Sequence, residues 1–486
     1  MSNIKVMFVA SEIEPYAKTG GLADVSSALP KALKEKGVDI ISVMPLYSKV
    51  NREKYKLEKV MDMACVHMGN CEEWYSVYHT KEPYGNDVYF IEFNKYFDRP
   101  GIYHDPSGEY TDNPYRFAFF SKACMQLAKD LNFQPDIIHT NDWQTAFIPY
   151  YIKCGEDAFF WGTKSVITIH NIGYQGSFGD HVLDYAKIYR NDFNAGAFES
   201  FGGINILKGG IAFADKITTV SPTYAHEIMG PIGSNGLHDI LRARSGDVIG
   251  ILNGIDANVW NPSVDPLIEK NFTVKNYKTG KKANKKAVQN MFDLKDSPNV
   301  PLFAFIGRFA AQKGLGLLAG AVEWAINTMV CQVVILGSGD EAAQWYFGGL
   351  PARYPGRIGA YIGYDEKRSH MIEAGSDFFL MPSLYEPCGL NQMYSQSYGT
   401  LPIVRATGGL ADTVDQYDEY SGYGTGFKFY DIDHKALYNT MGWAVSTYFD
   451  RPDHMDNMIK QAMKKDFSWN NPANEYINIY KNLSGK

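Results

Sequence analysis

One hexapeptide, Thr-Gly-Gly-Leu-Ala-Asp, occurs twice in the 486-residue chain, at residues 19–24 and again at residues 407–412. A string of six residues recurs by chance far too rarely to explain this. Each copy follows a short apolar run and precedes a helical pattern, which is typical of a tight turn that opens a helix after a buried strand. The recurrence therefore predicts two domains of similar fold.

The start of the chain has the pattern of a βαβ unit. Residues 6–10 form a short apolar run, residues 23–36 a helical pattern, and residues 39–44 a second apolar run, with Gly37 where a C-cap glycine belongs. Two such strands joined by a helix form a parallel pair with a right-handed crossover. We therefore expect an α/β fold built on a parallel sheet.

The same pattern restarts in the second half, after a stretch at 253–266 that is rich in Asn, Asp and Pro. Further strands are predicted at 75–77, 88–93, 137–139, 165–170, 302–307, 332–336, 358–361, 378–381 and 401–404, and helices at 115–131 and 314–327. The prediction is two doubly wound, Rossmann-like α/β domains, residues 1–255 and 256–486. They would face a shared cleft at the carboxyl ends of their strands. The last helix, about 465–486, would pack back on the first domain.

Charge and composition exclude several classes of protein. The net charge of −7, from 47 Lys and Arg against 54 Asp and Glu, argues against a nucleic-acid binder. No apolar run reaches the length of a membrane span, the first apolar stretch is too short for a signal peptide, and the six cysteines form no C-x-x-C pair. We expect a cytoplasmic protein without membrane partners, or a plastid stromal one if a transit peptide has been removed.

The first copy of the hexapeptide is a candidate phosphate site. Two adjacent glycines let backbone N–H groups approach a ligand, the following helix offers its positive end, and Lys18 adds a charge. The stretch matches neither a Walker A nor a dinucleotide fingerprint. A tight turn with a surface lysine is the alternative.

Basic and acidic residues follow two strands of the second half. Arg308 and Lys313 lie five residues apart after the strand at 302–307 and could neutralise a leaving diphosphate. Glu386 lies in the turn after the strand at 378–381, where it could accept sugar hydroxyls or cap the next helix. Surface positions are the alternative for the two cations.

Polar residues also end two strands of the first half. His170 ends the strand at 165–170, and Asp142 follows the strand at 137–139. His170 is either a ligand group or a satisfied structural histidine, and Asp142 either holds a sugar hydroxyl or caps a helix. Asp431 and Asp433 form a D-x-D that we interpret as a turn, so no metal is expected.

Six strings in order resemble one family closely, the bacterial glycogen synthases and plant starch synthases of glycosyltransferase family 5. They are KTGGLADV at 18–25, HNIGYQG at 170–176, TTVSPTYAHEI at 218–228, LNGID at 252–256, GRFAAQKG at 307–314 and EPCGLNQMYSQSYGTLPIVRATGGLADTV at 386–414. The resemblance implies the two-domain GT-B fold and a retaining transfer of glucose. The donor would be ADP-glucose, leaving ADP, and the acceptor the non-reducing end of an α-1,4-glucan such as glycogen or starch.

The resemblance also implies roles for individual residues, with no cofactor or metal. The catalytic group would be Lys18, His170, Arg308, Lys313 and Glu386, with the His170 carbonyl facing the anomeric carbon. The nucleotide-sugar group would be Lys18, Gly21, Asp24, Asn253, Arg308, Lys313, Tyr364, Cys388, Gly389, Thr407 and Gly408, with Tyr364 stacked on the base. The glucan and glucose group would be Glu12, Asp142, His170, Asn171 and Glu386.

Retaining GT-B enzymes often carry a second glutamate eight residues after the first, and this chain has Tyr394 there. That departure leaves the ribose contact open. No carboxylate is placed as a nucleophile, so we expect same-face substitution with the departing phosphate as base. Three alternatives remain: a UDP-glucose-using glucosyltransferase, a pyridoxal-phosphate glucan phosphorylase, and a non-catalytic glucan-binding protein.

Overall fold

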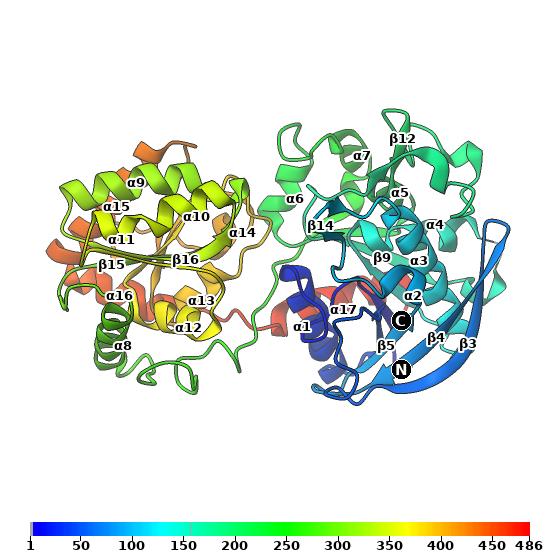
Figure 1. The fold of residues 1–486 in the computed structure, drawn as a ribbon, viewed down its shortest axis with the longest axis horizontal. Helices are drawn as coiled ribbons and strands as arrows, with labels where there is room; N and C mark the ends of the chain where they lie inside the picture. The colour runs from blue at the N-terminus through cyan, green and yellow to red at the C-terminus, as the bar shows by residue number, and fades with distance from the viewer. Residues whose placement is uncertain (1–2, 156) are drawn as a thin grey trace. The chain divides into compact units, whose positions relative to one another are not determined.

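The computed structural model describes residues 3–155 and 157–486 and contains two compact units (Figure 1). The first is Met1–Gly254 together with Trp469–Lys486, and the second is Ile255–Ser468. The chain first passes from one to the other within the Asn-, Asp- and Pro-rich stretch at 253–266. Both units are doubly wound and α/β, which confirms the predicted fold class.

The sheet of the first unit has the strand order β14-β13-β9-β8-β1-β2-β5-β4-β3. From β14 to β5 neighbouring strands are parallel, whereas β4 and β3 form an antiparallel extension. The bounds are β1 Lys5–Val9, β2 Asp39–Pro45, β3 Glu58–Met68, β4 Cys71–Thr80, β5 Asp87–Glu92, β8 Ile137–Asn141, β9 Lys164–Ile169, β13 Lys216–Thr219 and β14 Val248–Gly250. The chain order reverses between β1 and β8, and parallel sheets bind ligands at such a point.

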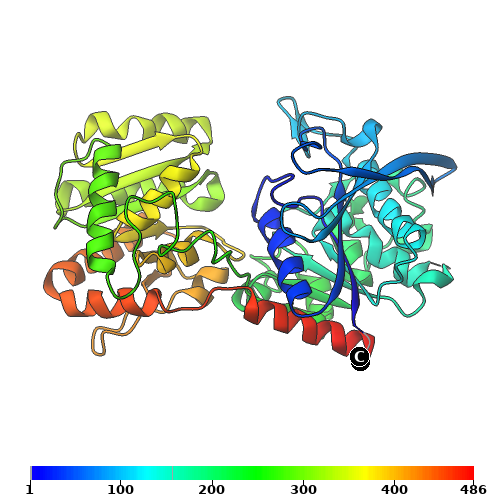
Figure 2. The same cartoon turned by 90° about the horizontal axis from the view of Figure 1, so that it is seen from below.

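Helices cover both faces of this sheet. In Figure 2, α1 (Gly21–Glu35) and α17 (Asn470–Ser484) lie on one side of the strands, and α3 (Asn113–Asp130) and α4 (Phe147–Cys154) lie on the other. The unit also contains α2 Asn94–Phe97, α5 Ile206–Phe213, α6 Pro222–Ile228, α7 His238–Ala243 and the short strands β6 His104–Asp105, β7 Gly108–Glu109, β10 Ser177–Phe178, β11 Glu199–Ser200 and β12 Gly203–Asn205. Tyr480 anchors α17, because its hydroxyl lies 2.6 Å from Nδ1 of the buried His139 on β8.

The sheet of the second unit is parallel throughout, in the order β17-β16-β15-β18-β19-β20. Its bounds are β15 Leu302–Phe309, β16 Gln332–Gly339, β17 Ile358–Ile362, β18 Phe378–Met381, β19 Leu401–Arg405 and β20 Phe427–Phe429. The helices are α8 Tyr277–Met291, α9 Leu315–Thr328, α10 Glu341–Gly348, α11 Leu350–Arg353, α12 Glu366–Gly375, α13 Asn391–Ser397, α14 Gly408–Thr413, α15 His434–Asp450 and α16 Pro452–Ala462. Figure 1 shows α9, α10 and α15 on one face, and α8, α12 and α13 on the other. A separate apolar core lies between the sheet and each of these two helix layers.

The central strands owe their place to uninterrupted apolar runs. β1 reads KVMFV and β15 begins LFAFI, and these apolar runs are buried along almost their whole length. Strands buried on both faces of a parallel sheet need such runs, whereas the alternating, partly exposed pattern of β3 suits an edge. All the predicted strands are present, and β3, β13, β14 and β20 were not predicted because they are short or half exposed.

Two details of the repeat differ from expectation. Helix α1 begins at Gly21 rather than at residue 23, so the glycines of the first copy belong to the turn and the first helical residue. The first copy follows the central strand β1, but the second follows β19, which lies between β18 and β20. The repeat therefore correctly indicates two similar folds, although its copies occupy non-equivalent places.

Two smaller predictions also have an outcome. Gly37 has φ +87° after the end of α1, and its N–H bonds the Lys34 carbonyl, as a C-cap glycine does. Asp433 accepts a bond from the Lys435 N–H at the start of α15, so this aspartate caps the helix and lies in the turn before it, as predicted. None of the helices in the described ranges combines the length and apolar character of a membrane span.

Candidate active site

Three loops of the first unit meet at the carboxyl edge of its sheet. They follow β1, β8 and β9, which are neighbours in the order β9-β8-β1. The His170 N–H donates to Oδ1 of Asp142 at 2.7 Å, and the His170 ring nitrogen Nε2 lies 2.8 Å from Oδ1 of Asn141. The topology thus brings together His170 and Asp142, which lie 28 residues apart in sequence.

The protonation states in this cluster follow from burial. Loss of hydration lowers the pKa of His170 to about 3, so the ring is neutral at physiological pH. The same effect raises the pKa of Asp142 to about 7, although its hydrogen bonds from the His170 and Asn171 backbone act in the opposite direction. A neutral imidazole can donate or accept one hydrogen bond, but it brings no positive charge to a substrate.

Asp142 does not cap the helical turn that follows it. Its carboxylate bonds the next strand's loop instead, and its own backbone has φ +54°, in the left-handed region. Asn171 forms a local turn in which its Oδ1 accepts from the Gly173 N–H at 2.9 Å. These contacts give the two loops after β8 and β9 one fixed arrangement.

The Glu12 carboxylate is hydrogen-bonded to residues of its own unit. Its carboxylate is 2% exposed and accepts hydrogen bonds from the Thr19 N–H, from the Thr19 hydroxyl at 2.6 Å and from the Tyr103 hydroxyl at 2.7 Å. The residue therefore holds the turn that carries Gly20 and Gly21. A direct contact between Glu12 and a glucan stays a prediction.

Lys18 and Asp24 flank that turn on the surface. The ammonium of Lys18 lies 2.6 Å from Oδ1 of Asp24 and 4.0 Å from Glu14. Both partners of the short pair are partly exposed, so their attraction is weak and easily exchanged for a ligand.

The two copies of the hexapeptide differ in what surrounds their glycines. A Cβ built on Gly20 or on Gly21 would meet nothing within 4 Å. A Cβ on Gly408 would lie 2.0 Å from the Glu386 carbonyl oxygen, and one on Gly409 would lie 2.1 Å from the Cys388 carbonyl oxygen. The second copy therefore requires glycine, because a larger residue would overlap with the backbone packed against it. At the first copy, the surrounding packing would allow a larger residue.

Four loops of the second unit lie at the carboxyl edge of its sheet, after β15, β17, β18 and β19. Glu386 is buried in the loop after β18, and its Oε2 accepts from Lys313 Nζ at 2.7 Å and from the Ser383 hydroxyl at 2.9 Å. No described residue donates a hydrogen bond to the other oxygen, Oε1. Glu386 therefore does not cap α13, and one carboxylate oxygen is left to accept.

Arg308 differs from Lys313 in having no internal partner. It is exposed near the end of β15, and its guanidinium has no hydrogen bond or ion pair with any residue in the described ranges. A guanidinium offers five donors and is always charged. Of these two cations, Arg308 is thus unpaired within the described residues, whereas Lys313 is already paired with a buried carboxylate.

The loop from Glu386 to Gly389 packs on the start of α14. Cys388 and Thr407 are buried, Gly408 has φ +43° and Gly389 has φ +73°. The Gly409 N–H donates to the carbonyls of Glu386 and Pro387, both at 3.1 Å. These contacts bring Glu386, Cys388, Gly389, Thr407 and Gly408 together at one place in the unit.

Two further predicted nucleotide residues lie elsewhere in the sequence. Tyr364 follows β17 and its side chain is 81% exposed. Asn253 is buried and is the last residue but one of the first unit's main segment. Their contact with a base or ribose stays a prediction.

Three residues of the site were missed by sequence reasoning. Asn141 orients the His170 ring, Tyr103 bonds Glu12, and Ser383 bonds Glu386. Asn141 had a signal, since it stands beside Asp142 in the string HTNDW. Tyr103 and Ser383 had none, because each reaches its partner only through the fold. Within residues 3–155 and 157–486, no group of three or more His, Cys, Asp or Glu could hold a metal ion.

Comparison with known proteins identifies the family to which this chain belongs. The model of the starch synthase catalytic domain matches residues 5–243, and that of the group 1 glycosyl transferases matches residues 289–465. Glycogen synthase 1 of Geobacter metallireducens is 43% identical over 485 residues, covering 99% of this chain and 96% of that protein. The chain belongs to the glycogen and starch synthase family. It is therefore a glycosyltransferase that elongates glycogen or starch.

Members of the family from distant sources cover the chain end to end. The glycogen synthase of Thermotoga maritima is 41% identical over 491 residues, with 99% of both chains covered. The catalytic domain of starch synthase IV from Arabidopsis thaliana, solved bound to ADP and acarbose, superposes with a TM-score of 0.91 at 32% identity and covers 100% of each chain. Both units of the present chain thus have counterparts in the GT-B fold of this family.

Proposed function

We propose that the protein transfers glucose from ADP-glucose to the non-reducing end of an α-1,4-glucan, with retention of the anomeric configuration and without a metal ion. The observation that supports the choice of donor is the starch synthase IV catalytic domain, which covers the whole of this chain and was solved with ADP and acarbose. ADP is the product that ADP-glucose leaves, and acarbose is a glucan-like ligand. The acidic chain fits a neutral glucan acceptor.

The diphosphate is proposed to bind at the two open cationic features. Arg308 has no partner within the described chain, and the Gly20–Gly21 turn offers backbone N–H groups and the positive end of the 15-residue helix α1. Lys313, paired with Glu386 at 2.7 Å, adds a second cation. Negative charge grows on the leaving phosphate in the transition state, where preorganised cations stabilise it most.

Glucose is proposed to contact polar groups that can bind its hydroxyls and its anomeric carbon. Oε1 of Glu386 is available to accept from a sugar hydroxyl, while Oε2 is fixed by Lys313 and Ser383. His170 is neutral, so its ring nitrogen and its carbonyl act as polar groups and not as a charged acid. Tyr364, Asn253 and Thr407 are proposed to contact the nucleoside.

The transfer step needs no covalent enzyme intermediate in this proposal. The bond from the anomeric carbon to the diphosphate oxygen breaks, and the acceptor hydroxyl oxygen forms a bond on the same face. The hydroxyl proton moves to the departing phosphate oxygen, so charge and atoms balance. Trapping of a glucosyl adduct on Glu12, Asp142 or Glu386 would contradict this mechanism.

The test is glucose transfer to glycogen from ADP-glucose and from UDP-glucose, measured side by side with EDTA present. Faster transfer from ADP-glucose, undiminished by EDTA, is the expected result. A preference for UDP-glucose would refute the proposed donor, and loss of transfer in EDTA would refute metal-free transfer. Absence of transfer from both donors would refute the proposed activity altogether.

A further inference from the structure

Two histidines of the first unit, His139 on β8 and His170 directly after β9, differ in how their ring nitrogens are used. Both nitrogens of the buried His139 have partners, since Nδ1 lies 2.6 Å from the Tyr480 hydroxyl and Nε2 lies 2.6 Å from the Thr168 hydroxyl. His170 is partly buried, and its Nε2 lies 2.8 Å from Oδ1 of Asn141. Its Nδ1 makes no hydrogen bond with any residue in the two described ranges. The fold therefore fixes one nitrogen of His170 and leaves the other for a ligand.

The orientation of the Asn141 amide decides which nitrogen of His170 carries a hydrogen. Nδ2 of Asn141 donates to the Val9 carbonyl on β1 at 3.0 Å. A carbonyl oxygen only accepts, so the nitrogen of the amide must face Val9 and its oxygen must face the imidazole. If the amide were turned over, two carbonyl oxygens would meet at Val9. Because Oδ1 of Asn141 also only accepts, the hydrogen of its contact with the imidazole belongs to Nε2 of His170.

Hydrogen bonds hold both Asn141 and the backbone of His170 in this arrangement. Asn141 is fully buried at the end of β8, where its N–H donates to the Thr145 hydroxyl at 2.7 Å and its carbonyl accepts from that hydroxyl at 2.9 Å. The next residue, Asp142, accepts from the His170 N–H at 2.7 Å. Two consecutive residues thus hold the ring and the backbone of His170, so Nδ1 has a fixed position.

We infer that Asn141 is a positioning residue that fixes the tautomer of His170, so that Nδ1 carries a lone pair and accepts a hydrogen bond from a hydroxyl of the transferred glucose. This inference rests on the proposed function, in which His170 contacts the sugar. Loss of hydration keeps the ring uncharged, and a neutral imidazole with its hydrogen on Nε2 has none on Nδ1. The ring can therefore bind a group that donates a hydrogen bond and cannot bind one that only accepts.

The first test reads the tautomer in the resting protein and needs no activity. In protein labelled with ¹⁵N-histidine, long-range ¹H–¹⁵N correlation spectra distinguish a ring nitrogen that carries hydrogen from one with a lone pair. His170, assigned by its absence in His170→Gln, should show hydrogen on Nε2 and a lone pair on Nδ1. His370 gives the opposite pattern as a reference, because its Nδ1 donates to the Asp265 carboxylate at 2.7 Å. Hydrogen on Nδ1 of His170 would overturn the inference.

The second test compares two substitutions of Asn141. Asn141→Leu removes the acceptor at Nε2, whereas Asn141→Asp keeps an acceptor and adds a negative charge. A carboxylate raises the pKa of a neighbouring imidazole, so His170 in Asn141→Asp should carry hydrogen on Nδ1 at acid pH and lose it as pH rises. Relative to the parent protein, kcat/KM of Asn141→Asp for the nucleotide-sugar donor should therefore recover about tenfold between pH 6 and pH 9, the factor that one regained hydrogen bond corresponds to.

The same ratio for Asn141→Leu should stay low at every pH. Asp142 titrates in the parent and in each variant, so taking the ratio removes its contribution. A ratio that does not depend on pH in Asn141→Asp would show that Asn141 only supports the fold, and would overturn the inference.

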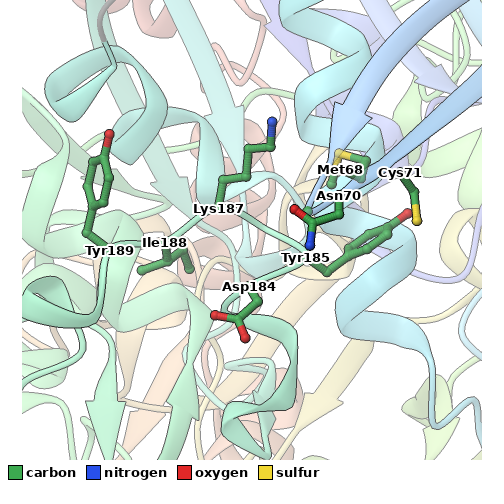
Figure 3. Close-up of a pocket in the computed structure, with 9 residues that line it drawn as sticks. Met68, Asn70, Cys71, Asp184, Tyr185, Lys187, Ile188 and Tyr189 are labelled. Atoms are coloured by element: carbon green, nitrogen blue, oxygen red, sulfur yellow. The ribbon is translucent and has the colours of Figure 1, made fainter.

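Asn70→Asp is the matched control, because it makes the same chemical change in the same unit. Asn70 is exposed and lines a separate cavity between the turn that joins β3 to β4 and residues 184–189 (Figure 3). Its ratio of kcat/KM to that of the parent protein should be the same at every pH. A recovery with pH in Asn70→Asp equal to that in Asn141→Asp would overturn the assignment to Asn141.

A ligand titration separates this inference from the proposed donor. A hydrogen bond accepted by Nδ1 of His170 shifts its ¹⁵N resonance, so ADP-glucose should shift it and ADP alone should not. If UDP-glucose shifts it and ADP-glucose does not, the proposed donor is wrong and the role of Asn141 is supported. If neither nucleotide sugar shifts it although glucose is transferred to glycogen, the sugar contact is overturned and the proposed function stands.

Discussion

Alanine at Gly21 and alanine at Gly409 should have opposite effects, although both replace the second glycine of the same hexapeptide. At Gly21 the new methyl group meets nothing within 4 Å, and the residue is the first of helix α1. Alanine is favoured over glycine in a helix by about 0.5–1 kcal/mol. Gly21→Ala should therefore leave the melting temperature of its unit unchanged or raise it slightly.

At Gly409 the methyl group would lie 2.1 Å from the Cys388 carbonyl oxygen and 2.5 Å from the Cys388 Cα. Both are backbone atoms, so no side chain can rotate away to relieve the overlap. Forced overpacking of this kind costs about 1–3 kcal/mol, and a unit of this size loses about 2–4 °C per kcal/mol. Gly409→Ala should thus lower the melting temperature of the second unit by several degrees.

The effect on activity should be the reverse, with the greater loss in Gly21→Ala. If a diphosphate approaches the Gly20–Gly21 turn, the Gly21→Ala methyl group stands in its way. A steric cost of about 1–3 kcal/mol lowers kcat/KM for the donor by about five- to 150-fold. The assay is calorimetric unfolding of both variants together with steady-state kinetics against ADP-glucose at saturating glycogen. Full donor kcat/KM in Gly21→Ala, or an equal loss of stability in the two variants, would refute the reasoning.

Two further predictions use the charges of the site. Arg308→Gln should leave the melting temperature unchanged, because the guanidinium has no partner in the described chain, yet it should lower kcat by about 10²–10³-fold with a smaller change in KM. An effect of Arg308→Gln on KM alone would contradict this assignment. Lys313→Gln should lower both kcat and stability, because it leaves the buried Glu386 without its ammonium partner. The pKa of Asp142 is raised to about 7 from an unfolded value of 3.8, so its contribution to stability is complete below pH 3.8 and is lost as pH rises through 7. The melting temperature of Asp142→Asn relative to that of the parent protein should therefore increase between pH 5 and pH 8. If the melting temperatures of the two proteins instead change in parallel with pH, Asp142 is already ionised in the folded protein.

Topology allowed the sequence to place the candidate site residues at the carboxyl edges of the two sheets. Residues that follow buried parallel strands must meet at one edge of the sheet, so His170 and Asp142 could be placed together although they lie in separate strings. Arg308, Lys313 and Glu386 were predicted in the same way from β15 and β18. The fold class followed from the same alternation of apolar runs and helical patterns.

What each site residue does within its own unit was beyond the sequence. Glu12 was expected on the acceptor side, but its carboxylate holds Thr19 and meets Tyr103, which lies 91 residues away. The pKa of Asp142 depends on how completely its surroundings exclude water, and no local pattern encodes that exclusion. Long-range partners of this kind exist only once the sheet order is fixed.

The twin hexapeptides show most directly where local sequence stops being informative. Identical residues begin a helix in both units, yet one pair of glycines packs against the Glu386–Gly389 loop and the other faces open space. A glycine that its own chain does not require is explained by something outside the chain that approaches closely. Arg308 and the Oε1 of Glu386 are likewise unmatched within the described residues, whereas Glu12 and Oε2 of Glu386 are fully used. The polar groups that lack hydrogen-bond or ion-pair partners within the fold are therefore the ones available to bind a negatively charged leaving group and a hydroxyl-rich sugar.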